Sequence, residues 1–516
     1  MAFDVVEPEA SLCWSPWLFR LSLRHGSSFR RGLHGSIRAI LPASKLESAT
    51  LFYHCSDGSF GLGLDDSYTE LVGYSRMKTL IPYFATALLV VSSVALAIVA
   101  HQKRVEASIS VAQSDTPTPE AARSAYEFIN SIGVNTHLNY FDRIYGNFPL
   151  VEQELRSIGI LHLRDGIHLQ NDDYNRALYG RWIELGKLGI RFDAVVDPRS
   201  NLPPITPTLL ASVDNLSGQT IESFEGPNEL DIGALPDWKS VDRNYETTLF
   251  DATHSIPGSE RITVIGPSLA HARNGLDLGN ISAKSDEGNL HPYPAAKMPS
   301  IVFPEQTDLA KIIYGDQPIV FTESGYHNAL NDHHDQPAVS EAAAAKYIPR
   351  LFLEDFARGI PRTYLYEFMD ETADPGLRDN QLHWGLIRAD GSEKPAFTAI
   401  KNLIDELHDN NEAAPLHQLA WALSAQDEHL HHLLLVKSNG EFDLVLWQEV
   451  ESFDYKNQSD ISNGNHAATL TLGASARSVT VFQPSLQGQP LFTRTNIASV
   501  PLQIPDSPLV IKISLR

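Results

Sequence analysis

The sequence predicts an α/β fold: a (β/α)8 barrel of the TIM-barrel type, followed by an antiparallel β-sandwich. Between residues 123 and 410, short β-rich runs alternate with amphipathic helical stretches, which is typical of a parallel sheet wrapped by helices. After residue 410 the helical pattern is replaced by alternating apolar and polar residues. The length of 516 residues accommodates one barrel of about 200 to 250 residues and smaller flanking units.

The barrel prediction rests on eight strand candidates in order along the chain. They are residues 132–137, 160–164, 191–196, 221–226, 262–266, 288–293, 318–323 and 363–368. Helical patterns occupy 150–158, 174–188, 244–254 and 339–358, and a closing helix lies near 396–408. Eight such repeats close a barrel.

The C-terminal segment, 411–516, contains five short runs with the two-residue period of half-buried strands. These are 433–437, 442–447, 469–472, 478–482 and 509–513, and Gly and Asn separate them. His429, His431 and His432 are expected on an exposed face of this region. The pattern predicts a sandwich of about 100 residues.

Charge and cysteine content exclude several classes of function. The chain has 40 Lys and Arg against 63 Asp and Glu, a net charge of −23, which repels phosphate backbones and makes nucleic acid an unexpected partner. Both cysteines, Cys13 and Cys55, precede the apolar run described next. Disulfide frameworks, zinc-thiolate sites and cysteine nucleophiles are therefore excluded from the main body.

An apolar run at residues 79–100 is long enough to span a bilayer. Together with Met77 and Lys78 and a small-x-small site at 95–97, it has the form of a signal peptide or an uncleaved membrane anchor over 77–100. We expect an extracytoplasmic protein, periplasmic or secreted, either released or anchored through 79–100. Residues 1–76 are then a cytoplasmic tail or, as we favour, an upstream extension from a misassigned start. Residues 101–122, rich in Thr and Pro near their end, are expected to be a linker before the barrel at 123–410.

Two carboxylates fall at the ends of barrel strands, where functional groups of such barrels lie. Glu229 follows the fourth strand and Glu323 ends the seventh. A single Glu at the end of a strand often occurs by chance and does not indicate catalysis. The ends of these two strands, however, are expected to face one cleft. Retaining hydrolysis of a glycosidic bond needs two carboxyl groups about 5 to 5.5 Å apart, one as acid and one as nucleophile. The pair therefore predicts this chemistry.

Asn228-Glu229 after strand four, with a Glu ending strand seven, resembles the clan of retaining glycoside hydrolases on (β/α)8 barrels, which includes cellulases, mannanases and β-xylosidases. The pattern is similar to families 39 and 5, and the C-terminal sandwich resembles the accessory domain of family 39. The resemblance implies that Glu229 is the acid/base and Glu323 the nucleophile. It also implies that Asn228 hydrogen-bonds the sugar 2-hydroxyl.

Weaker matches to the same clan concern residues around the nucleophile. Arg164, ending strand two, and Tyr293, after strand six, are placed to keep it ionised, although structural hydrogen bonds would explain both equally well. His137 and His291 are candidate sugar contacts. Glu225 lies within a strand and is expected in a buried polar network.

The clan's pattern ends strand eight with a tryptophan that forms a sugar platform. Here that strand contains no tryptophan, and Tyr366, Phe368 or Trp384 is expected to replace it. Trp384 comes from the loop that follows.

The leading hypothesis is a retaining glycosidase that acts on a β-linked oligo- or polysaccharide without metal or organic cofactor. One alternative is a barrel that binds carbohydrate at the cell surface without cleaving it, against which the presence of both carboxylates argues. Another is a metal-dependent barrel hydrolase. That class favours paired histidines at the end of strand one, where this chain has Asn135-Thr136-His137.

Overall fold

The computed structural model describes residues 10–14, 17–24, 34–40, 48–56, 59–64, 109, 116–200, 203–233, 235–303, 305–333, 336–412, 417–424 and 427–516. The chain divides into two units, Met1–His101 and Gln102–Arg516, which are described separately. The predicted signal or anchor segment at 77–100 lies outside the described residues. In the described ranges, no helix has both the length and the apolar character needed to cross a membrane.

The N-terminal unit contains a five-stranded antiparallel sheet, which the sequence did not predict. Its strands are β1 (Ala10–Trp14), β2 (Trp17–Arg24), β3 (His34–Ile40), β4 (Ser48–Ser56) and β5 (Ser59–Leu64). Each strand pairs with the next one along the chain, so the sheet is a meander.

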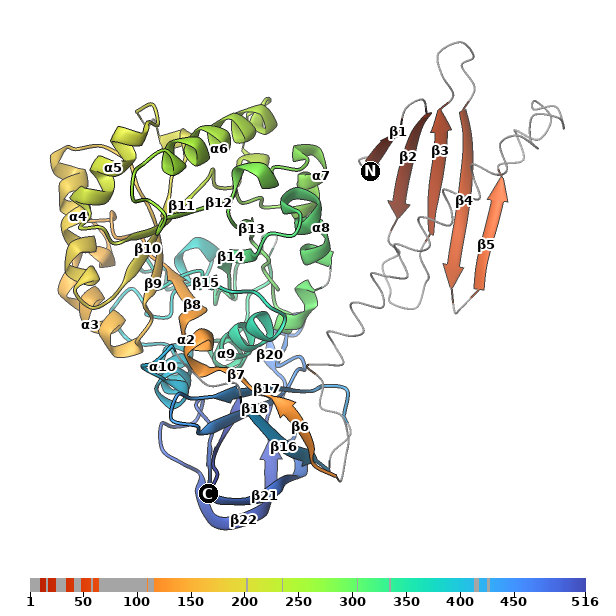
Figure 1. Ribbon diagram of the computed structural model, residues 1–516, viewed down its shortest axis with the longest axis vertical. Coiled ribbons are helices and arrows are strands. Elements are labelled where there is room, and N and C mark those ends of the chain that lie inside the picture. Colours follow the sequence, from red (N-terminus) through yellow and green to blue (C-terminus); the bar gives the residue numbers. More distant parts are fainter. Residues whose placement is uncertain are drawn as a thin grey trace. The chain divides into compact units, whose positions relative to one another are not determined.

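The second unit contains the predicted parallel barrel (Figure 1). Its strands are β8 (Ile132–Asn135), β9 (His162–Gly166), β10 (Arg191–Val195), β11 (Ile221–Glu225), β12 (Thr263–Ile265), β13 (Gly288–Leu290), β14 (Ile319–Ser324) and β15 (Thr363–Leu365). Neighbours in sequence are neighbours in space, and β15 returns to pair with β8. Between β12 and β13 the ring closes through one parallel bridge, Ile265 to Glu287. All eight predicted strands are confirmed, with shifts of a few residues at their ends.

Helices surround these strands in Figure 1. They are α2 (Ala125–Asn130), α3 (Phe148–Ile158), α4 (Asp173–Gly186), α5 (Pro207–Leu216), α6 (Trp238–His254), α7 (Gly275–Leu278), α8 (Glu305–Tyr314), α9 (Glu341–Ala357) and α10 (Pro395–Leu407). The five predicted helices correspond to α3, α4, α6, α9 and α10. In α10 the apolar residues recur every three or four positions and are buried against the barrel: Phe397, Ile400, Leu403, Ile404 and Leu407. Burial of each such side chain contributes roughly 1.5 to 3 kcal/mol.

Alternation along the strands sends polar side chains into the barrel. In β9, Leu163 belongs to the hydrophobic core, while its neighbour Arg164 bonds to side chains of other strands. Strand register places Arg164 opposite Asn135 on one side and Asp193 on the other. All three are at most 5% exposed, so a buried polar layer lies inside the barrel.

The C-terminal domain is built from β16 (Gln418–Leu423), β17 (Leu430–Val436), β18 (Phe442–Gln448), β21 (His466–Phe482), β22 (Phe492–Ile504) and β23 (Leu509–Ser514), with a small hairpin of β19 (Phe453–Asp454) and β20 (Ser459–Asp460). The long strand β21 pairs with β16 through its first half and with β23 through its second half. The strands enclose a hydrophobic core of their own, which agrees with the predicted sandwich. His431 and His432 are buried, at 5% and 8% exposure, so the expectation of an exposed face was wrong for them.

The linker prediction for 101–122 is also wrong at its C-terminal end. Residues Thr118–Ala121 form strand β6, which pairs antiparallel with β16, and Arg123–Ser124 form β7, which pairs parallel with β17. Pro119 fits here because β6 is an edge strand, where a missing N–H breaks no ladder hydrogen bond. The β-domain therefore includes residues from before the barrel as well as after it.

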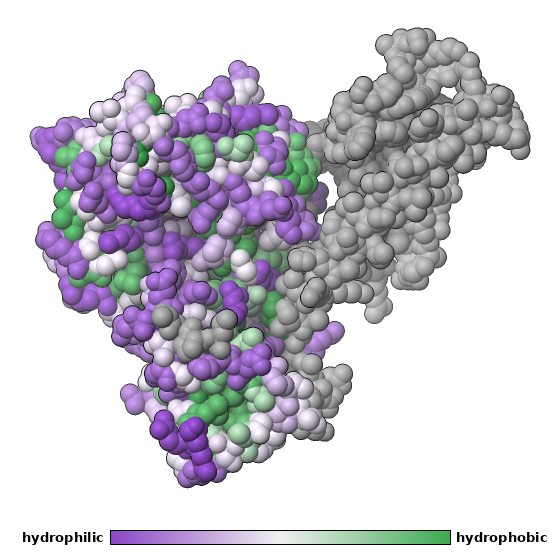
Figure 2. Space-filling view, viewed as in Figure 1, coloured by the Kyte–Doolittle hydropathy of each residue, from purple (hydrophilic) through white to green (hydrophobic). Residues whose placement is uncertain are grey.

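Barrel and β-domain are joined through α9. The guanidinium of Arg350, which is fully buried, donates to the carbonyl oxygens of Gln448 at 2.7 Å and Asp506 at 2.9 Å. Hydrophilic residues cover much of the barrel surface visible in Figure 2, and an apolar patch lies on the visible face of the β-domain.

Candidate active site

The two predicted carboxylates share one site. Glu229 follows β11, and Glu323 lies near the end of β14. A carboxylate oxygen of Glu229 lies within 4.8 Å of a carboxylate oxygen of Glu323. The side chains are 20% and 12% exposed, respectively. The two groups are therefore close enough to act on the same atom and still reach solvent.

The loop after β11 is held in a fixed conformation. Glu229 has φ of +49° in the left-handed region, which non-glycine residues rarely adopt. Its backbone N–H donates to the Ser268 carbonyl at 3.1 Å, and the N–H of Asn228 donates to Asp197 at 3.2 Å. These contacts determine the direction of the Glu229 side chain and offset the unfavourable backbone conformation.

Arg164 links both carboxylate strands to the floor of the barrel. Its Nε and Nη2 form a bidentate pair with Glu225 at 2.6 and 2.8 Å. Nη1 donates to Asn135 at 2.8 Å and to Glu323 at 2.7 Å, and Nη2 donates to Asn228 at 2.7 Å. All five N–H donors of the guanidinium are thereby used. The predicted placement of Arg164 beside Glu323 agrees with the structure.

Glu323 is surrounded by groups that favour its ionised form. Burial alone would raise the pKa of its carboxyl, but His291, Arg164 and the hydroxyl of Tyr293 outweigh burial and lower this pKa below its ordinary value. The Tyr293 hydroxyl donates to Oε2 at 2.7 Å, while Arg164 holds Oε1. A largely buried carboxylate with this donor set is held in its ionised form.

His291 occupies a different place from the sugar contact predicted for it. Its side chain is fully buried, with Nδ1 2.7 Å from Glu229 Oε1 and 3.6 Å from Glu323 Oε2. Nε2 lies 2.9 Å from the hydroxyl of Thr322. Burial lowers the pKa of the imidazole, but the two glutamates raise it above its ordinary value overall. His291 therefore acts on the carboxylates and has no free nitrogen for a ligand.

Asn228 has a side-chain amide that is available as a hydrogen-bond donor. Its Oδ1 accepts from Arg164 at 2.7 Å and from the Ser268 hydroxyl at 3.2 Å. Because the oxygen is engaged by these donors, the amide nitrogen is the group left for a ligand, and no partner within the described residues is recorded for it. The contact of Asn228 with a sugar hydroxyl, which the resemblance implies, stays a prediction.

Three aromatic side chains beside Glu323, those of Tyr293, Trp384 and Tyr366, form an aromatic wall. The rings of Tyr293 and Trp384 lie 5.0 Å apart, and those of Trp384 and Tyr366 lie 5.9 Å apart. Trp384 is 5% exposed and Phe368 is fully buried, whereas Tyr366 is partly exposed. Among the three candidates for the sugar platform, Tyr366 thus has the most accessible ring.

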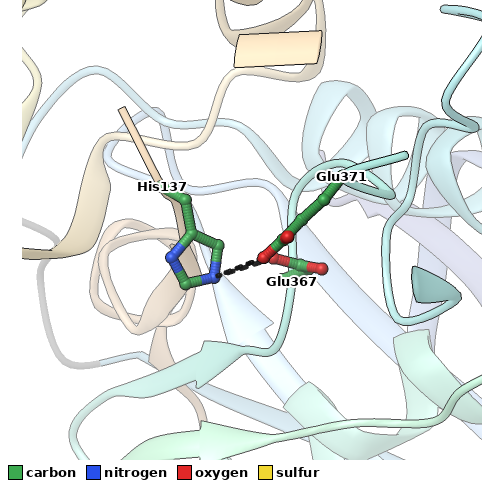
Figure 3. Close-up of side chains that lie close together, drawn as sticks. All are labelled: His137, Glu367 and Glu371. Atoms are coloured by element: carbon green, nitrogen blue, oxygen red, sulfur yellow. Dashed lines mark ion pairs between the residues drawn. The ribbon is translucent and has the colours of Figure 1, made fainter. Parts of the chain in front are cut away.

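His137 lies at the far end of this wall. Its Nε2 is 2.9 Å from Glu367 Oε2 (Figure 3). The Tyr366 hydroxyl lies 3.3 Å from the same nitrogen. Sequence reasoning placed His137 near the cleft but did not identify Glu367.

Several residues that support the site were not predicted. Asn289 donates to Glu225 at 3.0 Å, and the Thr322 hydroxyl donates to Asn289 at 2.8 Å. Both belong to the strands β13 and β14, where the two-residue alternation could have marked them as inward-facing. Glu225 itself is fully buried in this network, as expected for it.

Two groups of three side chains in the described ranges lie close enough to contact one ion. They are Glu229, His291 and Glu323, and His137, Glu367 and Glu371. The first group contains the two carboxylates already discussed.

No protein-family model matches the sequence, and no curated relative matches it. Solved structures do match. A glucosidase from Croceicoccus marinus has a TM-score of 0.53 at 12% identity, covering 78% of this chain and 98% of that chain. A GH39 enzyme from Xanthomonas axonopodis pv. citri has a TM-score of 0.52 at 12% identity, with the same coverage. At this identity the likeness shows the fold alone, and it confirms that this chain has the barrel and β-domain architecture of those glycoside hydrolases.

Proposed function

We propose that this protein is a retaining glycoside hydrolase that cleaves β-linked glycans, with Glu323 as nucleophile and Glu229 as acid/base. The observation that carries the proposal is the approach of the two carboxylates to within 4.8 Å. Retaining enzymes hold the two groups about 5 to 5.5 Å apart, while inverting enzymes leave about 6.5 to 9.5 Å for a water molecule. The short separation favours direct attack by a carboxylate.

In the first step, protonated Glu229 gives its proton to the glycosidic oxygen as the bond to the anomeric carbon breaks. Glu323 attacks that carbon with an oxygen lone pair and forms a glycosyl ester, and the leaving group departs as an alcohol. His291, 2.7 Å from one oxygen of Glu229, fixes the orientation of this carboxyl group.

In the second step, Glu229, now a carboxylate, takes a proton from a water molecule that attacks the anomeric carbon. The ester bond breaks and Glu323 leaves as a carboxylate. Two inversions at one carbon return the starting configuration.

The surrounding groups match what these steps require of them. Arg164 and Tyr293 each donate to Glu323, so they keep the nucleophile ionised and aimed before attack. The free amide nitrogen of Asn228 would donate to the sugar hydroxyl next to the anomeric carbon. A net charge of −23 favours a neutral glycan over an anionic one.

The test is hydrolysis of a panel of aryl β-glycosides and β-linked oligosaccharides, followed by NMR of the first anomer released. We expect turnover with retention, and loss of turnover in E323Q and E229Q, each with the melting temperature of a folded protein. A 2-deoxy-2-fluoro glycoside should label Glu323, which peptide mass spectrometry would locate. Inversion, or full activity of E323Q, would overturn the proposal; sugar binding without turnover by the wild type would favour the non-catalytic alternative.

A further inference from the structure

A second group of charged side chains lies at the C-terminal end of the barrel, where β8 and β15 are adjacent. His137 follows β8, and Glu367 and Glu371 follow β15 (Figure 3). His137 Nε2 is 2.9 Å from Glu367 Oε2 and 4.0 Å from Glu371 Oε1. Glu367 is fully buried, and neither of its carboxylate oxygens accepts a well-aligned hydrogen bond from a described residue, so its contact with His137 is an ion pair.

Each carboxyl group of this cluster has a basic partner. Arg143 pairs with Glu371 through the carboxylate oxygen that faces away from His137, and His137 pairs with Glu367. Burial lowers the pKa of His137, but the contact with Glu367 outweighs it and raises this pKa above its ordinary value. Asp165 and Glu323 add further negative potential at His137. Burial also raises the pKa of Glu367, although His137 opposes this shift. A divalent ion at this place would compete with a proton on His137 and would lie near the Arg143 guanidinium.

Aromatic rings hold the imidazole of His137 in one orientation. It stacks on Tyr140 with centroids 4.8 Å apart and planes 8° from parallel. The edges of Tyr145 and Tyr366 close two further sides at 6.0 and 5.8 Å. Nε2 lies 2.9 Å from Glu367 Oε2 and 3.3 Å from the Tyr366 hydroxyl. The other nitrogen, Nδ1, has no hydrogen-bond partner within the described residues, and 21% of the side-chain surface is exposed.

The group is connected to the nucleophile by consecutive side-chain contacts. Tyr366 contacts both His137 and Trp384, Trp384 contacts Tyr293, and the Tyr293 hydroxyl donates to Glu323. Three aromatic side chains, those of Tyr366, Trp384 and Tyr293, thus connect His137 to Glu323.

We infer that Glu367 is a positioning residue. It fixes the imidazole of His137 so that the Nδ1–H of His137 donates to a hydroxyl of a sugar bound against the ring of Tyr366. Glu367 has no exposed surface, so it acts through His137 and does not touch the ligand. This inference rests on the proposed function, because the ligand is the sugar ring presented to Glu323. It adds a determinant of sugar recognition that depends on a buried carboxylate.

The first test compares kinetics of E367Q and H137A with the wild type on the best aryl glycoside. Loss of a charge-assisted hydrogen bond should raise KM on the order of tenfold in both variants, with a smaller change in kcat. The double variant E367Q/H137A should raise KM by no more than either single variant does. H137N should recover part of the affinity, because the Asn amide can donate from the position of Nδ1.

E371Q is the matched control, since it removes a carboxylate of the same group and leaves the His137–Glu367 contact in place. We expect its KM to match the wild type. An unchanged KM in folded E367Q and H137A, or an equal rise in E371Q, would overturn the inference while leaving glycosidase activity established.

The second test measures binding alone, by calorimetry of mono-deoxy analogues of the preferred sugar with E323Q. Removing one particular hydroxyl should weaken binding to E323Q on the order of tenfold but change nothing in E323Q/E367Q or E323Q/H137A. This result would support the inference even for a protein that lacks turnover, so failure of the proposed function is distinguishable. Equal losses in all three proteins would contradict it. Stabilisation of the wild type by Zn²⁺, Mn²⁺ or Ca²⁺ that E367Q abolishes would assign the group to a cation instead.

Discussion

Arg164 Nη1 lies 2.7 Å from Glu323 Oε1, and the same guanidinium forms a bidentate pair with Glu225. One buried guanidinium thus pairs with two carboxylates from different strands, of which Glu225 is fully buried and Glu323 is partly exposed. Because the guanidinium is anchored on Glu225, its distance to Glu323 is set by the barrel itself and not by a flexible loop.

R164K should lower kcat/KM on the order of a hundredfold, because a lysine cannot reproduce the five donors of the guanidinium. Glu323 has a lowered pKa, so its carboxylate form persists to a pH below the ordinary 4.5. Removing the Arg164 contact raises this pKa, and the acid limb of the pH profile of kcat/KM should move to higher pH. The measurement is that profile for R164K and wild type.

R362K provides the control for a general loss of stability. Arg362 precedes β15 at the opposite end of the barrel and pairs with Glu222 at 3.0 Å. It should leave the acid limb where it is. An acid limb that stays unmoved in folded R164K would contradict the role given to Arg164.

Y293F should reduce kcat/KM on the order of tenfold with little change in melting temperature, since it removes one hydrogen bond to Glu323 and keeps the ring against Trp384. The acid limb should again move upward, by less than in R164K. Y326F is the matched change, because the Tyr326 hydroxyl donates to the Lys297 carbonyl at 2.8 Å and not to a carboxylate. Equal kinetic effects in the two variants would mean that Tyr293 supports packing only.

The proximity of Glu229 and Glu323 was predictable because a strand-end rule converts sequence position into position in space. The place of His291 was not, since it depends on which way a side chain turns after β13. Strand β6 was missed for another reason: its composition is that of a linker, and its partner, Gln418 opposite Ala121, lies about 300 residues away. Short-range pattern carries no signal for such a pairing.

E354Q tests the contact between barrel and β-domain. Glu354 of α9 accepts from His431 at 2.6 Å and from the Trp447 indole at 2.8 Å, and it also pairs with Arg358. Burial would raise the pKa of Glu354, but His431 and Arg358 lower it to about 2. Removing one member of a buried pair costs about 3 to 5 kcal/mol, so E354Q should melt well below the wild type at neutral pH.

The pH dependence of melting should differ as well. The contribution of Glu354 is present above its unfolded pKa near 4.5 and is lost as the pH falls toward 2. The raised pKa of His431 gives a contribution that is present below pH 6.5 and lost as the pH rises through the folded value. Wild type should therefore lose stability on both sides of this window, while E354Q should show a flatter curve. D405N, which breaks the exposed Lys401–Asp405 pair, should change the free energy of unfolding by at most about 1 kcal/mol.

D242N should stabilise the protein increasingly as the pH rises. Asp242 on α6 is fully buried, and neither carboxylate oxygen has a hydrogen-bond partner within the described residues. Burial, with the negative charges of Asp231 and Asp197, raises its pKa from 3.8 to about 8. Folding therefore favours the protonated acid, and wild-type stability falls between these two pH values. An amide of the same shape does not ionise, so the melting temperature of D242N minus that of wild type should grow from about pH 4 to pH 8.

D251N is the control, an exposed change on the same helix, and it should show no such trend. A difference for D242N that stays constant with pH would contradict the prediction. It would mean that Asp242 stays ionised in the folded protein, with a cation or water as its partner.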